Sequence, residues 1–265
     1  MRVAAAPLDL VTGDVPANLA RARTAVEEAG AAGVELLALP EMWPTSFVPA
    51  AGAEELESSR RAVEDLAEHA CAAGVAVVGS AFGPVDASER PSNRLHLLEG
   101  GEVHVLHDKE HLFSPTAEHL VFRGGIEAPS ARPLGGGLVS GLICYDLRFP
   151  SVAAGAVGAG AELLVVVAQW PVARSAHWEV LLRGRAVEGQ SWVLGCNRGG
   201  IAEVGRRRMR LEFPGEAVLV SPHGEVTARA RDELLVGAVD WELARELRRL
   251  VPLDEDAERR RARGG

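Results

Sequence analysis

The chain has 265 residues, 47% of them hydrophobic, which is ample for one large core, so we expect a single domain over residues 1–265. Its net charge of −9 disfavours nucleic acid as a partner, because phosphate would on average be repelled. The sequence shows no apolar run near the roughly 20 residues of a membrane span, no leader pattern, and only three cysteines, so a cytoplasmic location is expected.

In the first half of the chain, strand patterns alternate with helical ones. A strand over residues 2–6 precedes a helix that Asp14 can cap, and a second strand covers residues 34–39. After a proline-punctuated loop come a helix over residues 54–73, a strand over residues 75–81, and a hairpin of residues 93–98 and 102–106.

The second half repeats the alternation. In order, it shows a strand over residues 137–143, a helix from Ser151, a strand over 163–167, a helix over 176–188, a strand over 192–196, a hairpin of 217–220 and 225–230, a strand over 234–239, and a helix over 242–249. This order predicts an α/β sandwich in which helices cover apolar strands. Residues 254–265 are expected to form a tail that frays or packs on a partner subunit.

Cys144 lies where the strand over residues 137–143 gives way to a helix whose first turn suits Pro150. Backbone N–H groups exposed at such a point favour a thiolate and can hold a developing oxyanion. Burial as a small hydrophobe is, however, the commonest role of a free cysteine, so this segment alone leaves both interpretations open.

Two more chargeable residues follow apolar strands. Glu41 comes just after residues 34–39, and Lys109 follows the second arm of the first hairpin. Sites in open α/β sheets collect at the carboxyl ends of strands, so Cys144, Glu41 and Lys109 can converge there. Taken singly, Glu41 and Lys109 would each be interpreted as a solvated surface charge.

Together, the segments 39–41, 108–113 and 143–150 resemble, in order and spacing, the Glu, Lys and Cys motifs of the nitrilase superfamily of carbon–nitrogen hydrolases. The resemblance runs from Arg2 to about Arg260, and Glu118 matches a second glutamate of the family. It implies a four-layer α-β-β-α sandwich, commonly dimerised through helices, that needs no cofactor.

The closer resemblance is to the omega-amidase branch, and it rests on residues 169–178, 185–190 and 195–198. There are departures: Gln169 replaces the usual asparagine, residues 199–214 are arginine-rich in place of a glycine-rich loop with aromatics, and Gly215-Glu216 is atypical. These departures bear on the substrate more than on the chemistry.

The resemblance implies a catalytic role for each matched residue. Cys144 is the expected nucleophile and Glu41 the general base that takes the thiol proton. Lys109 and the backbone N–H of Tyr145 are expected to hold the oxyanion, and Glu118 to orient Lys109, the attacking water or the leaving amine.

Recognition of a dicarboxylate monoamide, the substrate class of omega-amidases, needs a cation for the free carboxylate. Arg174 and Arg148 are the candidates for that bidentate contact, although a structural ion pair near Cys144 is the favoured role for Arg148. Trp170, Phe113 and Trp43 are candidate pocket walls, with ordinary core packing as the alternative.

Other patterns do not point to a cofactor or metal. Four histidines, at positions 104, 107, 111 and 119, have no ligating cysteine pair, and the Gly135–Gly137 run precedes a strand instead of a helix. Cys71 on an apolar helical face and Cys196 in a buried strand are expected to be inert.

The small-molecule amide is thus the expected partner, with a homodimer or higher homo-oligomer as the assembly. On the same four residues, a nitrilase, an N-carbamoyl amidohydrolase or an acyltransferase stays open, as does a non-catalytic scaffold of the same fold.

Overall fold

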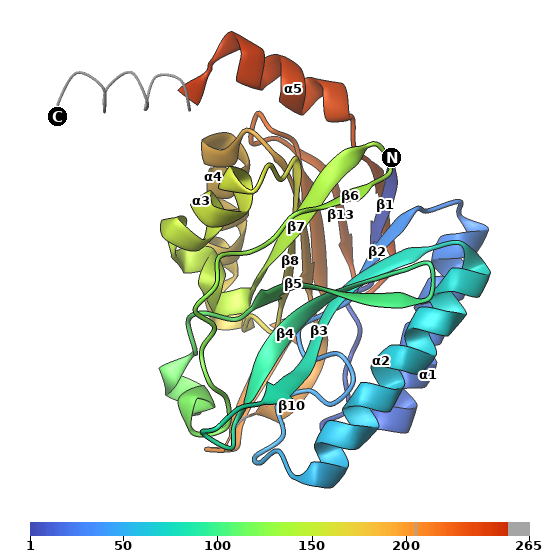
Figure 1. Cartoon of the computed structure of the whole chain (residues 1–265), viewed down its shortest axis with the longest axis vertical. Coiled ribbons are helices and arrows are strands. Elements are labelled where there is room, and N and C mark those ends of the chain that lie inside the picture. Colours follow the sequence, from blue (N-terminus) through green and yellow to red (C-terminus); the bar gives the residue numbers. More distant parts are fainter. Residues whose placement is uncertain (205, 254–265) are drawn as a thin grey trace, which may run out of the picture.

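Two six-stranded sheets pack face to face between two layers of helices in the computed structural model, which describes residues 1–204 and 206–253 (Figure 1). In spatial order, the first sheet contains β14 (Leu235–Ala238), β1 (Arg2–Ala5), β2 (Leu36–Ala38), β3 (Ala76–Val85), β4 (Pro91–Glu99) and β5 (Glu102–Asp108). The second contains β13 (Val226–Arg231), β12 (Glu216–Val220), β9 (Trp192–Asn197), β8 (Leu163–Ala168), β7 (Gly137–Ile143) and β6 (Arg132–Leu134).

Helices cover the outer face of each sheet. α1 (Val15–Ala31) and α2 (Ala53–Ala73) lie on the first sheet, and α3 (Pro150–Gly158) and α4 (Ser175–Gly189) lie on the second (Figure 1). The predicted four-layer α-β-β-α sandwich is therefore confirmed. The family resemblance was needed to predict it, because periodicity alone does not separate one sheet from two.

Parallel strands form the centre of each sheet. β1, β2 and β3 run parallel in the first sheet, and β7, β8 and β9 run parallel in the second. β2, β8 and β9 are buried along their whole length, as expected for parallel strands covered on both faces. Glu41 and Cys144 follow the carboxyl ends of β2 and β7, whereas Lys109 and Glu118 lie on the loop after β5.

The two sheets approach closely at a glycine. A Cβ on Gly141 of β7 would lie 2.6 Å from Leu95 on β4 and 2.5 Å from the Val165 carbonyl on β8. No side chain fits there, so this position in the middle of a strand requires glycine.

The sequence predicted the start of α1 more accurately than it predicted the strands at the edges of the sandwich. The Asp14 carboxylate accepts a 3.0 Å hydrogen bond from the Ala17 N–H, as expected for its N-cap. The sequence did not predict β6 or the ribbon of β10 (Gly199–Val204) and β11 (Met209–Pro214).

The prediction for Cys71 was wrong in one respect: its side chain is exposed, because the buried face of α2 passes through Leu66, Ala67 and Ala70 instead.

α5 (Trp241–Leu250) lies outside the four layers and closes one end of the sandwich (Figure 1). The Trp241 indole donates a 2.7 Å hydrogen bond to the Gly135 carbonyl, and Arg245 pairs with Glu162. The Gly135–Gly137 run thus packs against a tryptophan.

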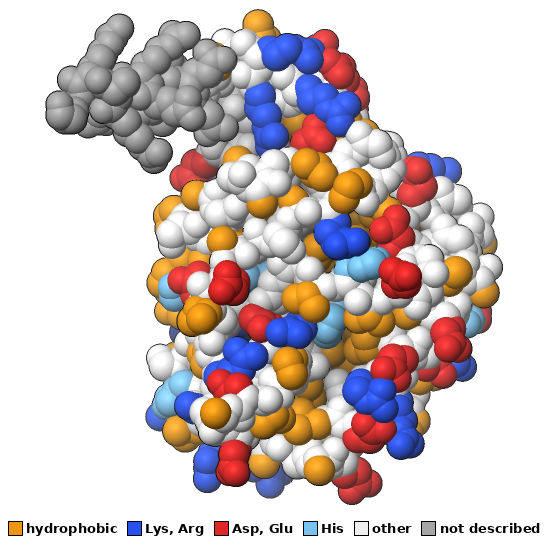
Figure 2. Space-filling view, in the orientation of Figure 1, with side chains coloured by type: hydrophobic (Ala, Val, Ile, Leu, Met, Phe, Trp, Pro, Cys, Tyr) orange, Lys and Arg blue, Asp and Glu red, His pale blue; other side chains and the backbone are white. Residues whose placement is uncertain are grey.

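Charged side chains of both signs are interspersed over the face in Figure 2. Within the described ranges, no helix is both long and apolar enough to cross a membrane.

Candidate active site

Cys144 stands at the point where β7 ends, on the first residue of a 3₁₀ turn, η3 (Cys144–Arg148), that precedes α3. Its φ is +47°, a left-handed conformation that is uncommon for a residue with a side chain and is concentrated at functional sites. Tyr145 is the second residue of this turn, where a backbone N–H has no intrahelical acceptor. The candidate nucleophile and the candidate oxyanion donor are therefore adjacent in this turn.

The three other members of the expected tetrad meet beside Cys144 in a buried cluster. The Lys109 ammonium lies 2.8 Å from Glu41 Oε1 and 2.7 Å from Glu118 Oε1, so it bridges the two carboxylates. Glu41, Lys109 and Glu118 are each at most 3% exposed. Two loops that are distant in the sequence, one with Glu41 and one with Lys109 and Glu118, thus bring an ammonium and two carboxyl groups together beside the thiol.

The electrostatics of this cluster keep Lys109 charged and the Cys144 thiol protonated. Burial by itself would lower the pKa of Lys109, but the charges of Glu118 and Glu41 raise it overall, so the ammonium persists. Burial also raises the pKa of Glu118, against the opposing effect of Lys109. Burial raises the pKa of the Cys144 thiol well above its usual value, and Glu41 raises it further. A base must therefore take the thiol proton before attack.

Asp146 connects the segment that carries Lys109 to the turn that carries Cys144. Its buried carboxylate accepts a 2.8 Å hydrogen bond from the His111 N–H and lies 3.1 Å from His107 Nε2. Sequence reasoning missed this role, although Asp146 is only two residues from the cysteine. His111 Nδ1 also lies 3.2 Å from Asp146 Oδ1, so the rings of both histidines contact this carboxylate.

Glu41 has further partners that the sequence did not single out. Asn93 Nδ2 donates to Oε1 at 2.9 Å, and the Gln169 N–H donates to Oε2 at 3.0 Å. Asn93 lies on β4, and its own carbonyl accepts from the Lys109 N–H at 2.8 Å. These contacts hold the carboxylate in one orientation. Nothing in the sequence indicated this role, because Asn93 lies between Ser92 and Arg94 in the polar first half of β4.

Two small cavities, of about 30 and 20 Å³, meet at Cys144. The first is lined by Trp170, Arg148 and Arg174, and the second by Glu41, Lys109 and Glu118. Both include Phe113. Both are far smaller than the roughly 300–1,000 Å³ of a pocket that takes a drug-sized ligand.

The unpredicted ribbon closes the second cavity. Val204 on β10 and Leu211 and Phe213 on β11 contribute apolar walls to it, next to the tetrad. The tip of the ribbon rests on the loop of Thr116, since Arg207 donates to the Pro115 carbonyl at 3.2 Å. The ribbon, which carries the arginine-rich segment, therefore borders the candidate site.

Of the candidate recognition residues, Trp170, Phe113 and Arg174 line the first cavity. The Arg174 guanidinium lies 5.7 Å from the centre of the Phe113 ring, and no carboxylate of the described residues pairs with it. The ion pair expected for Arg148 is absent from the described part of the chain. Its guanidinium instead stacks 4.8 Å above Trp170 and contacts His177 Nδ1 at 2.9 Å.

The structure places Trp43 elsewhere. Its side chain is 1% exposed and packs in the core between α1, α2 and the first sheet, so its interpretation as a pocket wall was wrong. Cys196 is buried and its thiol donates to the Ala6 and Ala38 carbonyls, consistent with the expected inert role.

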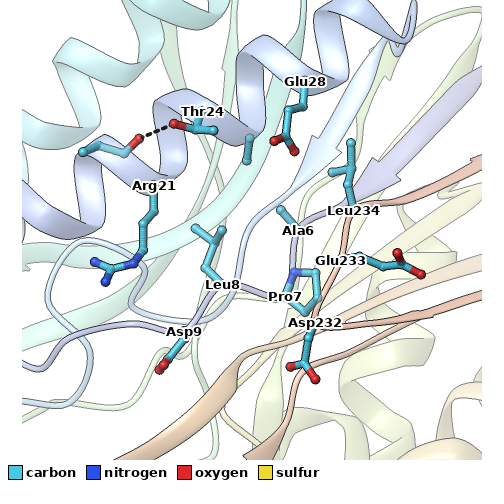
Figure 3. Close-up of a pocket in the computed structure, with 12 residues that line it drawn as sticks. Ala6, Pro7, Leu8, Asp9, Arg21, Thr24, Glu28, Asp232, Glu233 and Leu234 are labelled. Carbon is cyan, nitrogen blue, oxygen red and sulfur yellow. Dashed lines mark hydrogen bonds between the residues drawn. The ribbon is translucent and has the colours of Figure 1, made fainter.

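A larger groove, of about 460 Å³, lies between α1, the loop after β1 and the segment before β14 (Figure 3). Asp9, Glu28, Asp232 and Glu233 line it together with Arg21, but it contains no cysteine, lysine or histidine. The groove therefore lacks the thiol and the ammonium that meet at Cys144.

A family model described as carbon-nitrogen hydrolase matches residues 2–249. The chain belongs to this family. The omega-amidase YafV of Escherichia coli is 34% identical to it over 94% of this chain and 93% of that protein. The 2-oxoglutaramate amidase of Bacillus subtilis is 32% identical over 94% of both chains.

The comparison with solved structures likewise finds amidases. An amidase from Nesterenkonia sp. AN1, determined as a cysteine-to-alanine variant in complex with butyramide, matches this protein with a TM-score of 0.81 and 28% identity, covering 95% of this chain and 97% of that one. In another structure of that amidase, acrylamide has added to the active-site cysteine. The present chain is therefore a thiol-dependent amidohydrolase that acts on carbon–nitrogen bonds other than peptide bonds, and the prediction of an enzyme is confirmed.

Proposed function

We propose that this enzyme is an omega-amidase, which hydrolyses the terminal amide of a short dicarboxylate monoamide and releases ammonia. The observation that carries the proposal is Arg174, a cation beside the Cys144 cavity whose charge no carboxylate of the described residues neutralises. A planar guanidinium binds a carboxylate through two parallel hydrogen bonds. The omega-amidase and 2-oxoglutaramate amidase relatives support the same substrate class.

In the proposed first half-reaction, Glu41 takes the proton from the Cys144 thiol, and the sulfur attacks the amide carbon. The carbonyl π bond breaks and its electron pair becomes an oxyanion, held by the Lys109 ammonium and the Tyr145 N–H. Protonated Glu41 then gives its proton to the nitrogen. The C–N bond breaks, ammonia leaves, and a thioester remains on Cys144.

In the second half-reaction, Glu41 takes a proton from a water molecule, whose oxygen attacks the thioester carbon. The same oxyanion site holds the second tetrahedral intermediate. Its collapse breaks the C–S bond, releases the dicarboxylate and returns a proton from Glu41 to the sulfur. Glu118 keeps Lys109 in position through its two carboxylate oxygens, which lie 2.7 and 2.9 Å from the ammonium.

The substrate class is tested by replacing Arg174. In Arg174→Ala, we expect KM for glutaramate and succinamate to rise roughly 10- to 100-fold, because a hydrogen bond to a charged group contributes about 1.5–3 kcal/mol. Neutral amides of the same length lack the carboxylate, so their KM should change much less. Ammonia release from glutaramate, succinamate, 2-oxoglutaramate, glutamine and butyramide measures both effects.

Equal losses on charged and neutral amides would mean that Arg174 only shapes the loop after β8. Arg148→Ala is the matched comparison, since Arg148 lines the same cavity but stacks on Trp170. A selective loss in Arg148→Ala alone would move the carboxylate contact to that residue and contradict the role of Arg174.

We also propose a cytoplasmic homodimer, with residues 1–265 as one domain. Two valines support α4 as part of the interface: Val180 is 69% exposed and Val187 is 53% exposed. They are seven residues apart and thus lie on one face of the helix. The location and the single domain rest on the sequence argument. A monomer in analytical ultracentrifugation at micromolar concentration would contradict the dimer.

A further inference from the structure

Arg198, at the end of β9, is an arginine whose exposed fraction is 0%. Its nearest carboxylate, Asp9, is 3.2 Å away, but the Asp9 side chain is 66% exposed and lies on the open groove of Figure 3. A carboxylate in contact with solvent is screened and offsets little of the cost of burying a cation. Other contacts must therefore account for the placement of Arg198.

Those contacts use every donor of the guanidinium. Nε donates to the Gly199 carbonyl at 3.0 Å, and Nη2 donates to the Leu10 carbonyl at 2.6 Å and to Asp9. Nη1 donates to Ser46 Oγ at 2.9 Å and to Gln169 Oε1 at 3.2 Å. A guanidinium has five N–H donors, so these five acceptors satisfy it completely. Four of the five are neutral oxygens.

The contact with Gln169 leads to the general base. Gln169 Oε1 accepts from Arg198 and from Ser46 Oγ, so its amide nitrogen must face the other way. There, Nε2 donates to the Glu41 carbonyl at 2.9 Å, while the Gln169 backbone N–H donates to Glu41 Oε2 at 3.0 Å. Gln169 thus hydrogen-bonds to both the backbone and the carboxylate of Glu41, and Arg198 fixes the orientation of the Gln169 side chain.

We propose that Arg198 is a positioning residue for the general base Glu41 and acts through the side chain of Gln169. This inference rests on the proposed function, because it assumes that Glu41 takes the thiol proton. Arg198 itself lines neither of the two cavities, so it holds the base without touching substrate. The replacement of the usual asparagine by Gln169 supplies the longer side chain that spans from Arg198 to the Glu41 backbone.

A double-mutant cycle tests the route. Arg198→Lys keeps the charge but has three donors on a single nitrogen, so we expect kcat to fall about 10-fold or more with KM within about 2-fold. Gln169→Leu should lower kcat by at least as much. If Arg198 acts through Gln169, adding Arg198→Lys to Gln169→Leu should cost less than about 2-fold more.

Losses that multiply in the double variant would overturn the proposal, because Arg198 would then act independently of Gln169. Asp9→Asn separates the ion pair from the positioning contact: a loss as large as that of Arg198→Lys would also contradict it. Arg229→Lys is the matched control, since Arg229 pairs with Glu216 and Glu179 and contacts no residue of the tetrad.

Folding of each variant is checked by its melting temperature. Should Arg198→Lys not fold, the same cycle is run with Ser46→Ala, which removes the hydroxyl that joins Arg198 to Gln169. Its effect on kcat should likewise vanish in the Gln169→Leu background, and persistence would overturn the proposal. Glu41→Gln distinguishes failure of the proposed function from failure of this inference. An active Glu41→Gln variant would refute Glu41 as the general base. If Glu41→Gln is inactive but the losses multiply in the double variant, only the role of Arg198 is refuted.

Discussion

Cys144→Ala should release no detectable ammonia from any amide while keeping the native fold. Thioester formation needs a nucleophile at this position, and no second thiol or hydroxyl takes its place in the proposed mechanism. The fold should persist because Cys144 is a small side chain at the end of β7, bordering a cavity. Steady-state ammonia release and circular dichroism check the two halves of the prediction.

The other two cysteines provide matched controls. Cys71→Ala changes an exposed side chain, so activity and stability should both be retained. Cys196→Ala removes a buried sulfur between the sheets and should cost modest stability with activity preserved. Substantial hydrolysis by Cys144→Ala would exclude the thiol mechanism for this chain.

Lys109→Met should lower kcat at least about 100-fold with little change in KM. The ammonium is assigned to the oxyanion, which exists only in the transition state and the intermediates, and one such donor contributes about 3 kcal/mol. Its removal also leaves Glu41 and Glu118 buried without a counter-charge, so the free energy of unfolding should fall as well. Single-turnover rates on folded protein isolate the kinetic effect.

Lys109→Arg distinguishes an oxyanion role of Lys109 from a role that only balances the charges of the two carboxylates. The guanidinium is larger and planar, and it cannot bridge two carboxylates 2.7–2.8 Å away and still face a substrate oxygen from the same point. We therefore expect no rescue of kcat. An active Lys109→Arg enzyme would indicate that any cation suffices to balance the carboxylates, and the oxyanion role would have to be abandoned.

Much of the fold could be predicted from local patterns. The parallel strands are continuous apolar runs, and Asp14 caps α1 through a side chain that the sequence displays directly. The ribbon of β10 and β11 was missed because its exposed positions alternate with only a few apolar ones, such as Phe213, that face the cavity and the core. That pattern is typical of a surface loop as much as of strands.

Without the family resemblance, the sequence could predict only those site residues that carry a reactive or charged group and follow a strand. Cys144, Glu41 and Lys109 each follow a strand, whereas Asp146 and Arg198 act through contacts between loops that no local pattern reveals. Trp43 shows the opposite error. It is two residues from Glu41, but Met42 has a φ of +48° and the Trp43 N–H donates to the Ser80 carbonyl, which turns the indole toward the helices.

Trapping the acyl group tests the central claim, hydrolysis through a thioester on Cys144, most directly. With glutaramate as substrate and hydroxylamine present, the intermediate should partition between water and hydroxylamine. The hydroxamate and the free acid should then together equal the ammonia released, with no hydroxamate formed by Cys144→Ala. Ammonia release with no hydroxamate at any hydroxylamine concentration would contradict the account, because water would then attack the amide directly.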